Sequence, residues 1–393
     1  MPEASAFPVV VRRGRATIIS AAPIEVVVAD GVDALGCLDR LTPGWWAGFL
    51  TYDLGRAVEH VRPRLERDAT LPDLVLARYD ARLVIDDAGA HLEGDARARG
   101  HLDRLLEGAP APRALAPVGA PSTSLDRDAF EAGVRSVIAL IEAGDCYQVN
   151  LTRRLTWDTA VDPVALHHAL GCLNPAPHEG LFVLPGPSGP IAVVSASPER
   201  FLAWRGPDCE TRPIKGTAID DEWLRASPKD RAENVMIVDL ARNDLGRVCD
   251  YGSVQVPELL GIEEHPGLVH LVSTVRGRRR AGVGPGALVR ATFPPASVTG
   301  APKPRVLQAI EDLEPVRRGI YCGAIGWIDT ERDEADLAVA IRTFTISGGR
   351  TMLGVGGGIV ADSDPAAEWA ETELKAARLL DALGAPPTAG RAA

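Results

Sequence analysis

Residues 181–204, LFVLPGPSGPIAVVSASPERFLAW, contain three short apolar runs separated by turn-forming residues. The runs are Leu181–Leu184, Ile191–Ser195 and Phe201–Trp204. Each has the length and composition of a β-strand, and the gaps between them are too short for a crossover helix. The stretch therefore predicts consecutive antiparallel strands paired as a meander.

A second group of strand-like runs lies near the C-terminus. These runs are Tyr321–Ile328, Leu337–Ile346 and Thr351–Gly356, and a Ser-Gly-Gly turn at 347–349 joins the last two. Residues 1–106 also contain short β-like runs with turn residues between them. Strands thus dominate three separate parts of the chain.

Helical patterns lie between and after these strand groups. Apolar residues at helical spacing occupy 124–144, with Ser124 as a possible N-cap. A second helix opens with Ser227 and a proline and runs to residue 245, and a third covers 364–383. Because the strands are grouped apart from the helices, the sequence predicts an α+β fold.

The composition changes near residue 124 without marking a sharp domain boundary. Residues 1–123 form a weakly patterned, β-rich N-terminal part, and their last stretch, 108–124, is rich in Pro, Ala and Gly like a loop or linker. Residues 124–384 carry the strong patterns. Residues 385–393 predict a disordered tail.

The charge and cysteine content exclude several classes of protein. The 393 residues include 42 basic and 53 acidic side chains, a net charge of −11, and no basic block, so nucleic acid is not an expected partner. No apolar run reaches membrane-spanning length and no leader pattern precedes Thr17, which predicts a cytoplasmic protein without membrane association. The six cysteines are scattered singly and predict reduced thiols.

Carboxylates on two helices are candidate ligands for a hard cation. Glu368, Glu371 and Lys375 are spaced so that all three share one face of the last helix, and Glu233 lies in the helix before it. Two carboxylates on adjacent turns repel each other, and Mg²⁺ would make the arrangement favourable. A solvated face with a Glu371–Lys375 ion pair is the alternative.

Two further features are suited to binding an anion. The glycines at 356–358 leave backbone N–H groups open to close approach, although a plain glycine bulge has the same sequence. Arg342 lies within an apolar run, where a buried guanidinium needs an anionic partner, either a ligand or a structural carboxylate.

Three residues are candidates for acid, base or nucleophilic chemistry. Lys215 ends a strand-like run beside a glycine, where partial desolvation would lower its pKa. Glu199 and His270 are each a possible acid or base, or else a salt-bridged glutamate and a core histidine. Chemistry alone supports a magnesium-dependent site for a small carboxylate-bearing anion, with a lysine and an acid nearby.

Five segments, taken together and in order, resemble the chorismate-utilising enzymes. This family includes component I of anthranilate synthase and of aminodeoxychorismate synthase, isochorismate synthase and salicylate synthase. The matching segments are Ala143–Asn150, Ser197–Phe201, Pro213–Thr217, Glu233–Asp244 and Thr299–Lys303. The match spans about residues 124–384, and Thr51–Arg56 resembles the N-terminal part of the aminodeoxychorismate branch.

The resemblance implies one large domain, with two antiparallel sheets packed as a sandwich and helices outside. It implies that Glu233 and Glu371 bind Mg²⁺, with Glu368 close by. It implies that His270 lies near the C4 hydroxyl of chorismate. The substrate contacts that it implies are Gly216, Thr217, Arg342, Gly357, Gly358, Lys375 and Trp327, the last at a position where relatives often have Tyr.

Two positions separate the reactions of the family. Members that add water use a lysine base where this chain has Gln148, and lysine at position 215 is typical of the aminodeoxychorismate branch. There, the lysine amine attacks C2 as the C4 hydroxyl leaves with a proton from the acid that matches Glu199. Ammonia then attacks C4 and expels the lysine, giving 4-amino-4-deoxychorismate, the precursor of 4-aminobenzoate and folate.

The expected partner is a glutamine amidotransferase subunit that supplies the ammonia, because the chain contains no glutaminase signature. The nearest alternative is component I of anthranilate synthase or a related 2-amino-2-deoxyisochorismate synthase, neither of which needs a covalent lysine. A more remote alternative is a non-catalytic chorismate-binding homologue, which would be expected to lack the lysine, the acid or the metal ligands.

Overall fold

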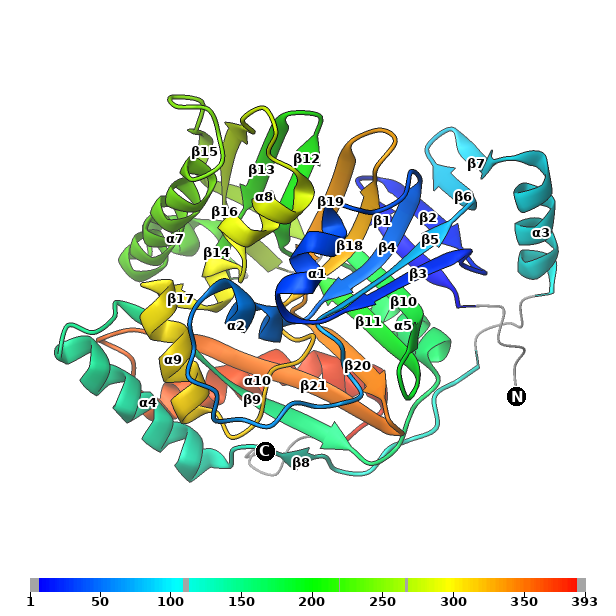
Figure 1. Cartoon of the computed structure of the whole chain (residues 1–393). Helices are drawn as coiled ribbons and strands as arrows, with labels where there is room; N and C mark the ends of the chain where they lie inside the picture. Colours follow the sequence, from blue (N-terminus) through cyan, green and yellow to red (C-terminus); the bar gives the residue numbers. More distant parts are fainter. Residues whose placement is uncertain (1–6, 109–112, 219, 266–267, 387–393) are drawn as a thin grey trace.

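Two large antiparallel β-sheets with helices packed outside them make up the protein (Figure 1). The structure is a computed structural model that describes residues 7–108, 113–218, 220–265 and 268–386. None of the described helices is long and apolar enough to cross a membrane.

The larger sheet, as described, contains eleven strands. In spatial order they are β17 (Gly300–Ala301), β9 (Gln148–Trp157), β21 (Arg350–Ile359), β20 (Thr343–Ser347), β11 (Gly189–Ser197), β10 (His178–Gly186), β1 (Val9–Arg13), β2 (Ala16–Ser20), β6 (Ala81–Asp86) and β7 (Gly89–Gly94), with β8 (Ser122–Thr123) beside β9.

The smaller sheet contains ten strands in the described part of the chain. In spatial order they are β14 (Ile214–Ala218), β16 (Leu268–Arg278), β13 (Asp208–Arg212), β12 (Arg200–Arg205), β19 (Glu334–Val339), β18 (Ala324–Asp329), β4 (Trp45–Leu50), β5 (Leu74–Tyr79) and β3 (Glu25–Ala29), with β15 (Gln255–His265) beside β16.

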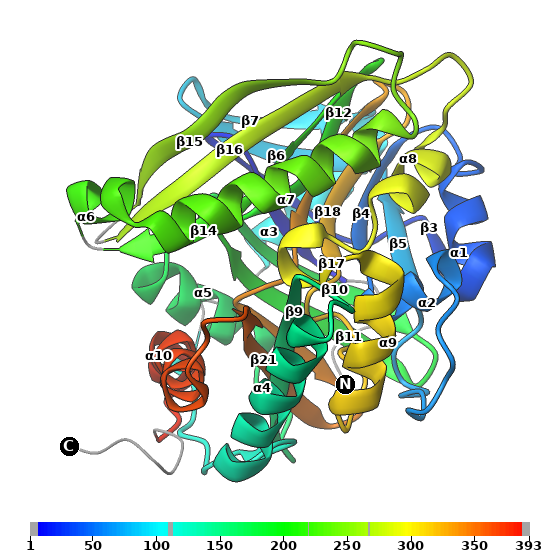
Figure 2. The ribbon, with the colours of Figure 1, turned by 90° about the vertical axis from the view of Figure 1, so that its left-hand side faces the viewer.

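Helices cover the outer faces of both sheets. Helix α7 lies along β14 and β16, and α10 packs against β21 and α4 (Figure 2). The helices are α1 (Gly31–Leu38), α2 (Gly55–Val58), α3 (Ala96–Glu107), α4 (Arg127–Glu142), α5 (Pro163–Leu173), α6 (Asp221–Ala226), α7 (Pro228–Gly246), α8 (Pro285–Thr292), α9 (Lys303–Leu313) and α10 (Pro365–Leu383), with 3₁₀ turns η1 (Tyr52–Leu54) and η2 (Ala296–Val298).

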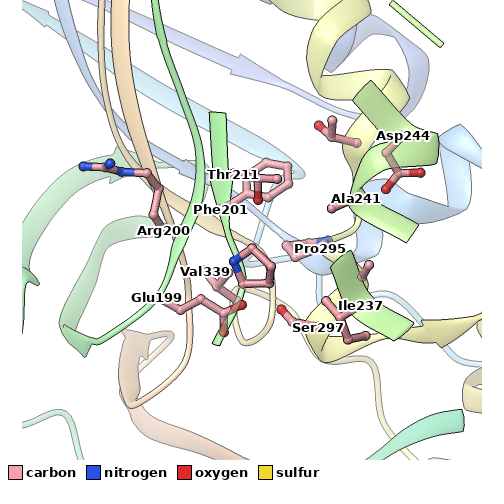
Figure 3. Close-up of a pocket in the computed structure, with 13 residues that line it drawn as sticks. Glu199, Arg200, Phe201, Thr211, Ile237, Ala241, Asp244, Pro295, Ser297 and Val339 are labelled. Carbon is pink, nitrogen blue, oxygen red and sulfur yellow. The ribbon is translucent and has the colours of Figure 1, made fainter. Parts of the chain in front are cut away.

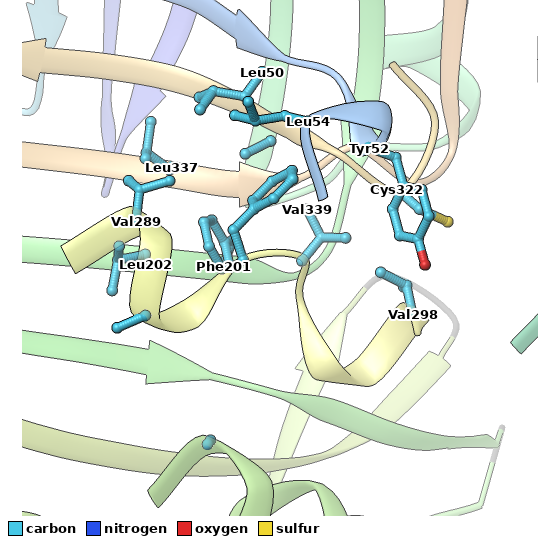
Figure 4. Packing of buried hydrophobic residues seen from close by; sticks show 14 of the residues in the cluster. Leu50, Tyr52, Leu54, Phe201, Leu202, Val289, Val298, Cys322, Leu337 and Val339 are labelled. Atoms are coloured by element: carbon cyan, nitrogen blue, oxygen red, sulfur yellow. The ribbon is translucent and has the colours of Figure 1, made fainter. Parts of the chain in front are cut away.

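The core has a layer between the sheets and layers beneath the helices. One buried cluster joins Val9 and Phe182 of the larger sheet to Phe49 and Ile325 of the smaller one. A second cluster contains side chains of the smaller sheet, of β9 and of the helices packed outside, and in it Phe201 packs edge-on against Phe293 among aliphatic side chains (Figure 4). These layers confirm the predicted sandwich.

The predicted meander at 181–204 is only half right. Strands β10 and β11 pair in antiparallel register, but β12 pairs with β13 and β19 in the other sheet. Pro198 follows β11 directly and has no N–H to donate, so the ladder ends there and the chain passes to the second sheet.

Several helix and strand limits were predicted correctly and two were not. Helices α7 and α10 begin and end close to the expected residues, with Ser227 as the N-cap of α7. Helix α4 is capped by Asp126 rather than Ser124, because the Asp126 carboxylate accepts the Ala129 N–H. The run Leu337–Ile346 is two strands, β19 and β20, with a break at 340–342.

The N-terminal part shares both sheets with the rest of the chain. Strand β1 pairs with β10 in the larger sheet, and β4 pairs with β18 in the smaller one. Helix α10 ends at Leu383, and residues 387–393 of the predicted tail lie outside the described residues.

Candidate active site

The end of β21 meets the polar face of α10. A Cβ placed on Gly357 would lie 3.1 Å from Glu368 Oε2, 3.8 Å from Glu371 Oε1 and 3.9 Å from Lys375 Nζ. The Lys375 ammonium group donates to the Gly356 carbonyl at 3.0 Å and lies 2.6 Å from Glu371 Oε1. The helical spacing therefore brings together the three charged groups predicted on this face.

Lys215 approaches the next glycine from the other sheet. A Cβ on Gly358 would lie 3.4 Å from Lys215 Nζ, and Glu233 Oε2 lies 3.8 Å from the same nitrogen. Only 13% of the lysine side chain is exposed. Burial lowers the pKa of Lys215 below its usual 10.5, although Glu233 and Glu199 partly offset that effect. A lower pKa favours the neutral, nucleophilic amine.

Gln148 is a buried amide without a hydrogen-bond partner in the part of the chain that the structure describes. Its side chain is 2% exposed, and neither Nε2 nor Oε1 is hydrogen-bonded. The Nε2 atom lies 2.0 Å from where a Cβ on Gly358 would stand, so a larger residue there would displace the Gln148 amide. An unpaired buried amide is costly, which is typical of a group held ready for a ligand.

Glu199 is a buried acid that points into a small cavity. Its carboxylate accepts the Ile214 N–H at 3.4 Å, and the Ser297 hydroxyl also hydrogen-bonds to it (Figure 3). Burial raises the pKa of Glu199 to about 7, against the opposing effects of Ser297 and Lys215. A carboxyl group with such a pKa can carry a proton near neutral pH and deliver it.

Arg342 occupies the break between β19 and β20 rather than the middle of a strand. Its backbone has φ of 50°, in the left-handed region that a non-glycine residue seldom adopts. Among the described residues, no carboxylate oxygen lies within the 4.0 Å of an ion pair with its guanidinium. Burial and the nearby Arg378 lower the pKa of Arg342. A guanidinium without an ion-pair partner in the described chain, carried on a strained backbone, is suited to an anionic ligand.

The strand that carries Lys215 is irregular at the site. Gly216 has φ of +78°, and the β14–β16 register shifts between Lys215 and Thr217. His270 on β16 is 1% exposed and pairs through its backbone with Thr217. The left-handed glycine thus redirects the chain directly after the lysine.

Glu233, Glu371 and Glu368 were predicted to bind Mg²⁺. Their carboxylate oxygens are the kind of ligand that this cation prefers. Glu368 is 4% exposed and accepts the Ser363 hydroxyl at 2.6 Å. Burial raises its pKa, and the Glu371 charge adds to this rise, so a nearby cation would stabilise the ionised form. As arranged, the described residues contain no group of three or more His, Cys, Asp or Glu side chains close enough to hold a metal ion.

Comparison with known proteins identifies the family and the architecture. The model of a family described as "chorismate binding enzyme" matches residues 15–381. The chain belongs to this chorismate binding enzyme family. Within this family member, residues far apart in sequence, on β9, β14, β21, α7 and α10, meet in one cluster.

Individual relatives within the chorismate binding enzyme family are similar over most of the chain. Aminodeoxychorismate synthase component 1 of Klebsiella aerogenes is 41% identical over 353 residues, covering 86% of this chain and 76% of that protein. Anthranilate synthase component 1 of Mycobacterium tuberculosis (strain ATCC 25618 / H37Rv) is 34% identical, covering 96% and 83%. The crystal structure of anthranilate synthase component I from Streptococcus pneumoniae superposes with a TM-score of 0.81 at 27% identity, covering 93% and 92%.

One predicted site residue of this family member lies elsewhere, and one contact was missed. Trp327 on β18 lies in the core layer between the sheets, with the Arg13 guanidinium 5.6 Å from its ring centroid. The structure does not bring it to the lysine and carboxylate cluster. Ser297 was not predicted as a site residue, because a serine in a short 3₁₀ turn carries no signal until the fold places it against Glu199.

Proposed function

We propose that this chain aminates chorismate at C4 to give 4-amino-4-deoxychorismate, in a Mg²⁺-dependent reaction that uses ammonia from a glutamine amidotransferase subunit. The observation that carries the proposal is the largely buried amine of Lys215, held against Gly358 and next to the Gln148 amide, which has no hydrogen-bond partner among the described residues. The similarity to aminodeoxychorismate synthase component 1 of three enterobacterial species, at 38–41% identity, supports it.

Lys215 acts as the nucleophile in this proposal. Its neutral amine forms a bond to C2 of chorismate, the ring double bonds shift, and the C4–oxygen bond breaks. Glu199 gives its proton to the departing hydroxyl, which leaves as water. Ammonia then bonds to C4, the double bonds shift back, and the C2–nitrogen bond to Lys215 breaks. Two easier substitutions replace one difficult one.

Binding and orientation come from the groups around the lysine. Arg342 and Lys375, with the backbone N–H groups of Gly357 and Gly358, would hold the two substrate carboxylates. Glu233, Glu371 and Glu368 would hold Mg²⁺, which when bound neutralises and orients a carboxylate. Fixing the ring in this way delivers C2 to the amine, and such positioning supplies a large part of the rate acceleration.

The first test is the identity of the product. The full chain is incubated with chorismate, Mg²⁺ and an ammonium salt, and the products are separated by chromatography with mass detection. Aminodeoxychorismate, converted to 4-aminobenzoate by an added lyase, supports the proposal. Anthranilate would overturn it in favour of the anthranilate synthase reaction, and unchanged chorismate in the presence of an added amidotransferase subunit would indicate a non-catalytic homologue.

The metal proposal has a separate test in direct Mg²⁺ binding. Calorimetric titration of the full chain should show a saturable site that Glu371→Gln weakens at least tenfold. Asp381→Asn makes the same charge change at an exposed position on the same helix and should leave binding unchanged. Equal affinities in the two variants would remove Glu371 from the set of ligands.

A further inference from the structure

A shallow depression lined by arginines lies away from the proposed active site. It forms where the middle of β9 and β21 meets the connection from α9 to β18, and it encloses about 240 Å³ of empty space, open solvent at its mouth included. The residues that matter here are Arg154, Arg317, Arg318, Glu314, Ser124 and Tyr321, which we call the arginine depression.

The arginine depression and the proposed active site lie at different positions along the paired strands β9 and β21. Arg154 of β9 faces Gly354 of β21, whereas Asn150 faces Gly358. Four residues therefore separate the two places, which is about 13 Å at 3.3 Å per residue.

Two of the four arginines that line the depression, Arg153 and Arg318, are paired with carboxylates, and Arg154 and Arg317 are not. Arg318 is paired with Glu314 at 2.7 Å, and both side chains are almost fully buried. Arg154 Nη1 donates to the Arg317 carbonyl at 3.4 Å, and Arg317 Nε donates to the Leu65 carbonyl at 3.1 Å. Over the residues that the structure describes, neither Arg154 nor Arg317 has a carboxylate oxygen within the 4.0 Å of an ion pair.

A carbonyl oxygen satisfies a hydrogen bond but carries no net charge, so neither the Arg154 nor the Arg317 charge is neutralised by a direct ion pair. Burial lowers the pKa of Arg154, an effect that Asp68 only partly offsets, so this guanidinium is held charged at an energetic cost. This local concentration of positive charge contrasts with the net charge of the whole chain, which is −11. Charge that is costly and unpaired is suited to an anionic ligand.

A hydroxyl donor completes the depression. Ser124 Oγ accepts the Arg154 N–H at 2.9 Å, which fixes the serine beside the arginine. In the described part of the chain its own proton has no hydrogen-bond acceptor, so it can donate to a ligand. Two planar guanidinium groups and one hydroxyl are the donors that a tetrahedral or planar oxyanion requires.

We propose that the arginine depression is a second anion-binding site, which takes a small doubly charged oxyanion, either a phosphate or a dicarboxylate, on Arg154, Arg317 and Ser124. The site does not depend on the proposed amination, because none of these residues takes part in it. Phosphate and dicarboxylate share the same donor requirements, and the choice between them is made by titrating each one.

The test is calorimetric titration of the full chain with inorganic phosphate, and separately with succinate, at low ionic strength. All measurements use an Arg342→Gln background, so that an anion bound at the proposed active site does not contribute. We expect one saturable site per chain for at least one of the two anions. Arg154→Gln and Arg317→Gln should each weaken it at least tenfold, whereas Arg242→Gln, the same change at an exposed arginine of α7, should not.

Arg154→Lys is a second variant that keeps the proposal testable if Arg154→Gln fails to fold. It keeps the charge but loses the planar fork, so binding should still weaken severalfold. The proposal is overturned if neither anion gives a saturable signal, or if Arg154→Lys and Arg317→Gln bind as tightly as Arg242→Gln.

Discussion

Two clusters of buried polar groups lie along strand β9 and differ in how completely they are paired. Around Glu314, the carboxylate accepts bonds from Arg318, from the Thr152 hydroxyl and from the Thr152 N–H, all at 3.3 Å or less. The Gln148 amide, four residues before Thr152 on β9, has no hydrogen-bond partner among the described residues. Complete pairing indicates a group that stabilises the fold, and incomplete pairing indicates one that awaits a ligand.

The largest effect is expected from a substitution in the cluster around Gln148, which includes Lys215. Lys215→Met should reduce amination at least about a thousandfold, the scale on which loss of a nucleophile acts in other enzymes, and should abolish any covalent adduct seen by mass spectrometry. The variant should fold at least as stably as the parent, because a desolvated amine has been removed. Arg242→Met is the matched surface control. Normal turnover would exclude the covalent mechanism.

The second prediction concerns the fully paired cluster around Glu314. Glu314→Gln leaves the Arg318 charge buried at 2% exposure, so it should lower the free energy of unfolding by about 3–5 kcal/mol in urea denaturation. Asp239→Asn breaks an exposed pair and should cost about 0–1 kcal/mol. A double variant, Glu314→Gln with Arg318→Met, should recover part of the loss. If Glu314→Gln and Asp239→Asn cost the same, the proposed contrast fails.

The third prediction concerns pH. Glu199 must be protonated to act as an acid, so kcat/KM should fall as pH rises through its pKa of about 7. Because this folded-state pKa lies above the usual 4.5, the stability linked to the proton is fully present below pH 4.5 and is lost as pH rises through 7. Glu199→Gln should remove both dependences. Retention of the pH-dependent fall in this variant would assign it to another group.

The smallest effect is expected from Gln148→Met. Replacing an unpaired buried amide by an apolar side chain of similar size should leave stability unchanged or raise it by about 1–3 kcal/mol, while activity falls about tenfold. Gln308 is the contrast, because its amide accepts the Arg62 N–H at 2.8 Å and donates to Asp312 at 3.0 Å. Gln308→Met should therefore not stabilise the protein. Thermal unfolding and initial rates measure both effects, and a destabilised Gln148→Met would show that the amide is paired after all.

Local patterns were sufficient for much of the fold. Ser227 followed by a proline marks the start of α7, and the spacing of Glu368, Glu371 and Lys375 places them on one face of α10, because capping and helical periodicity depend on near neighbours. The transfer of β12 to the second sheet was not predicted, since strand pairing is a long-range property and Pro198 alone does not name the new partner.

The sequence by itself determined the residue types of the site: a lysine beside a glycine, carboxylates on two helices, a glycine run and a candidate acid in Glu199. The tertiary structure decided which of them meet, because Lys215 and Gly358 belong to different sheets and no local pattern sets the distance between them. Among the described residues, it also left the Gln148 amide without a hydrogen bond and the Arg342 guanidinium without an ion pair, and it placed Ser297 against Glu199. Burial and pairing depend on the packing of both sheets together, and a linear sequence contains neither quantity directly.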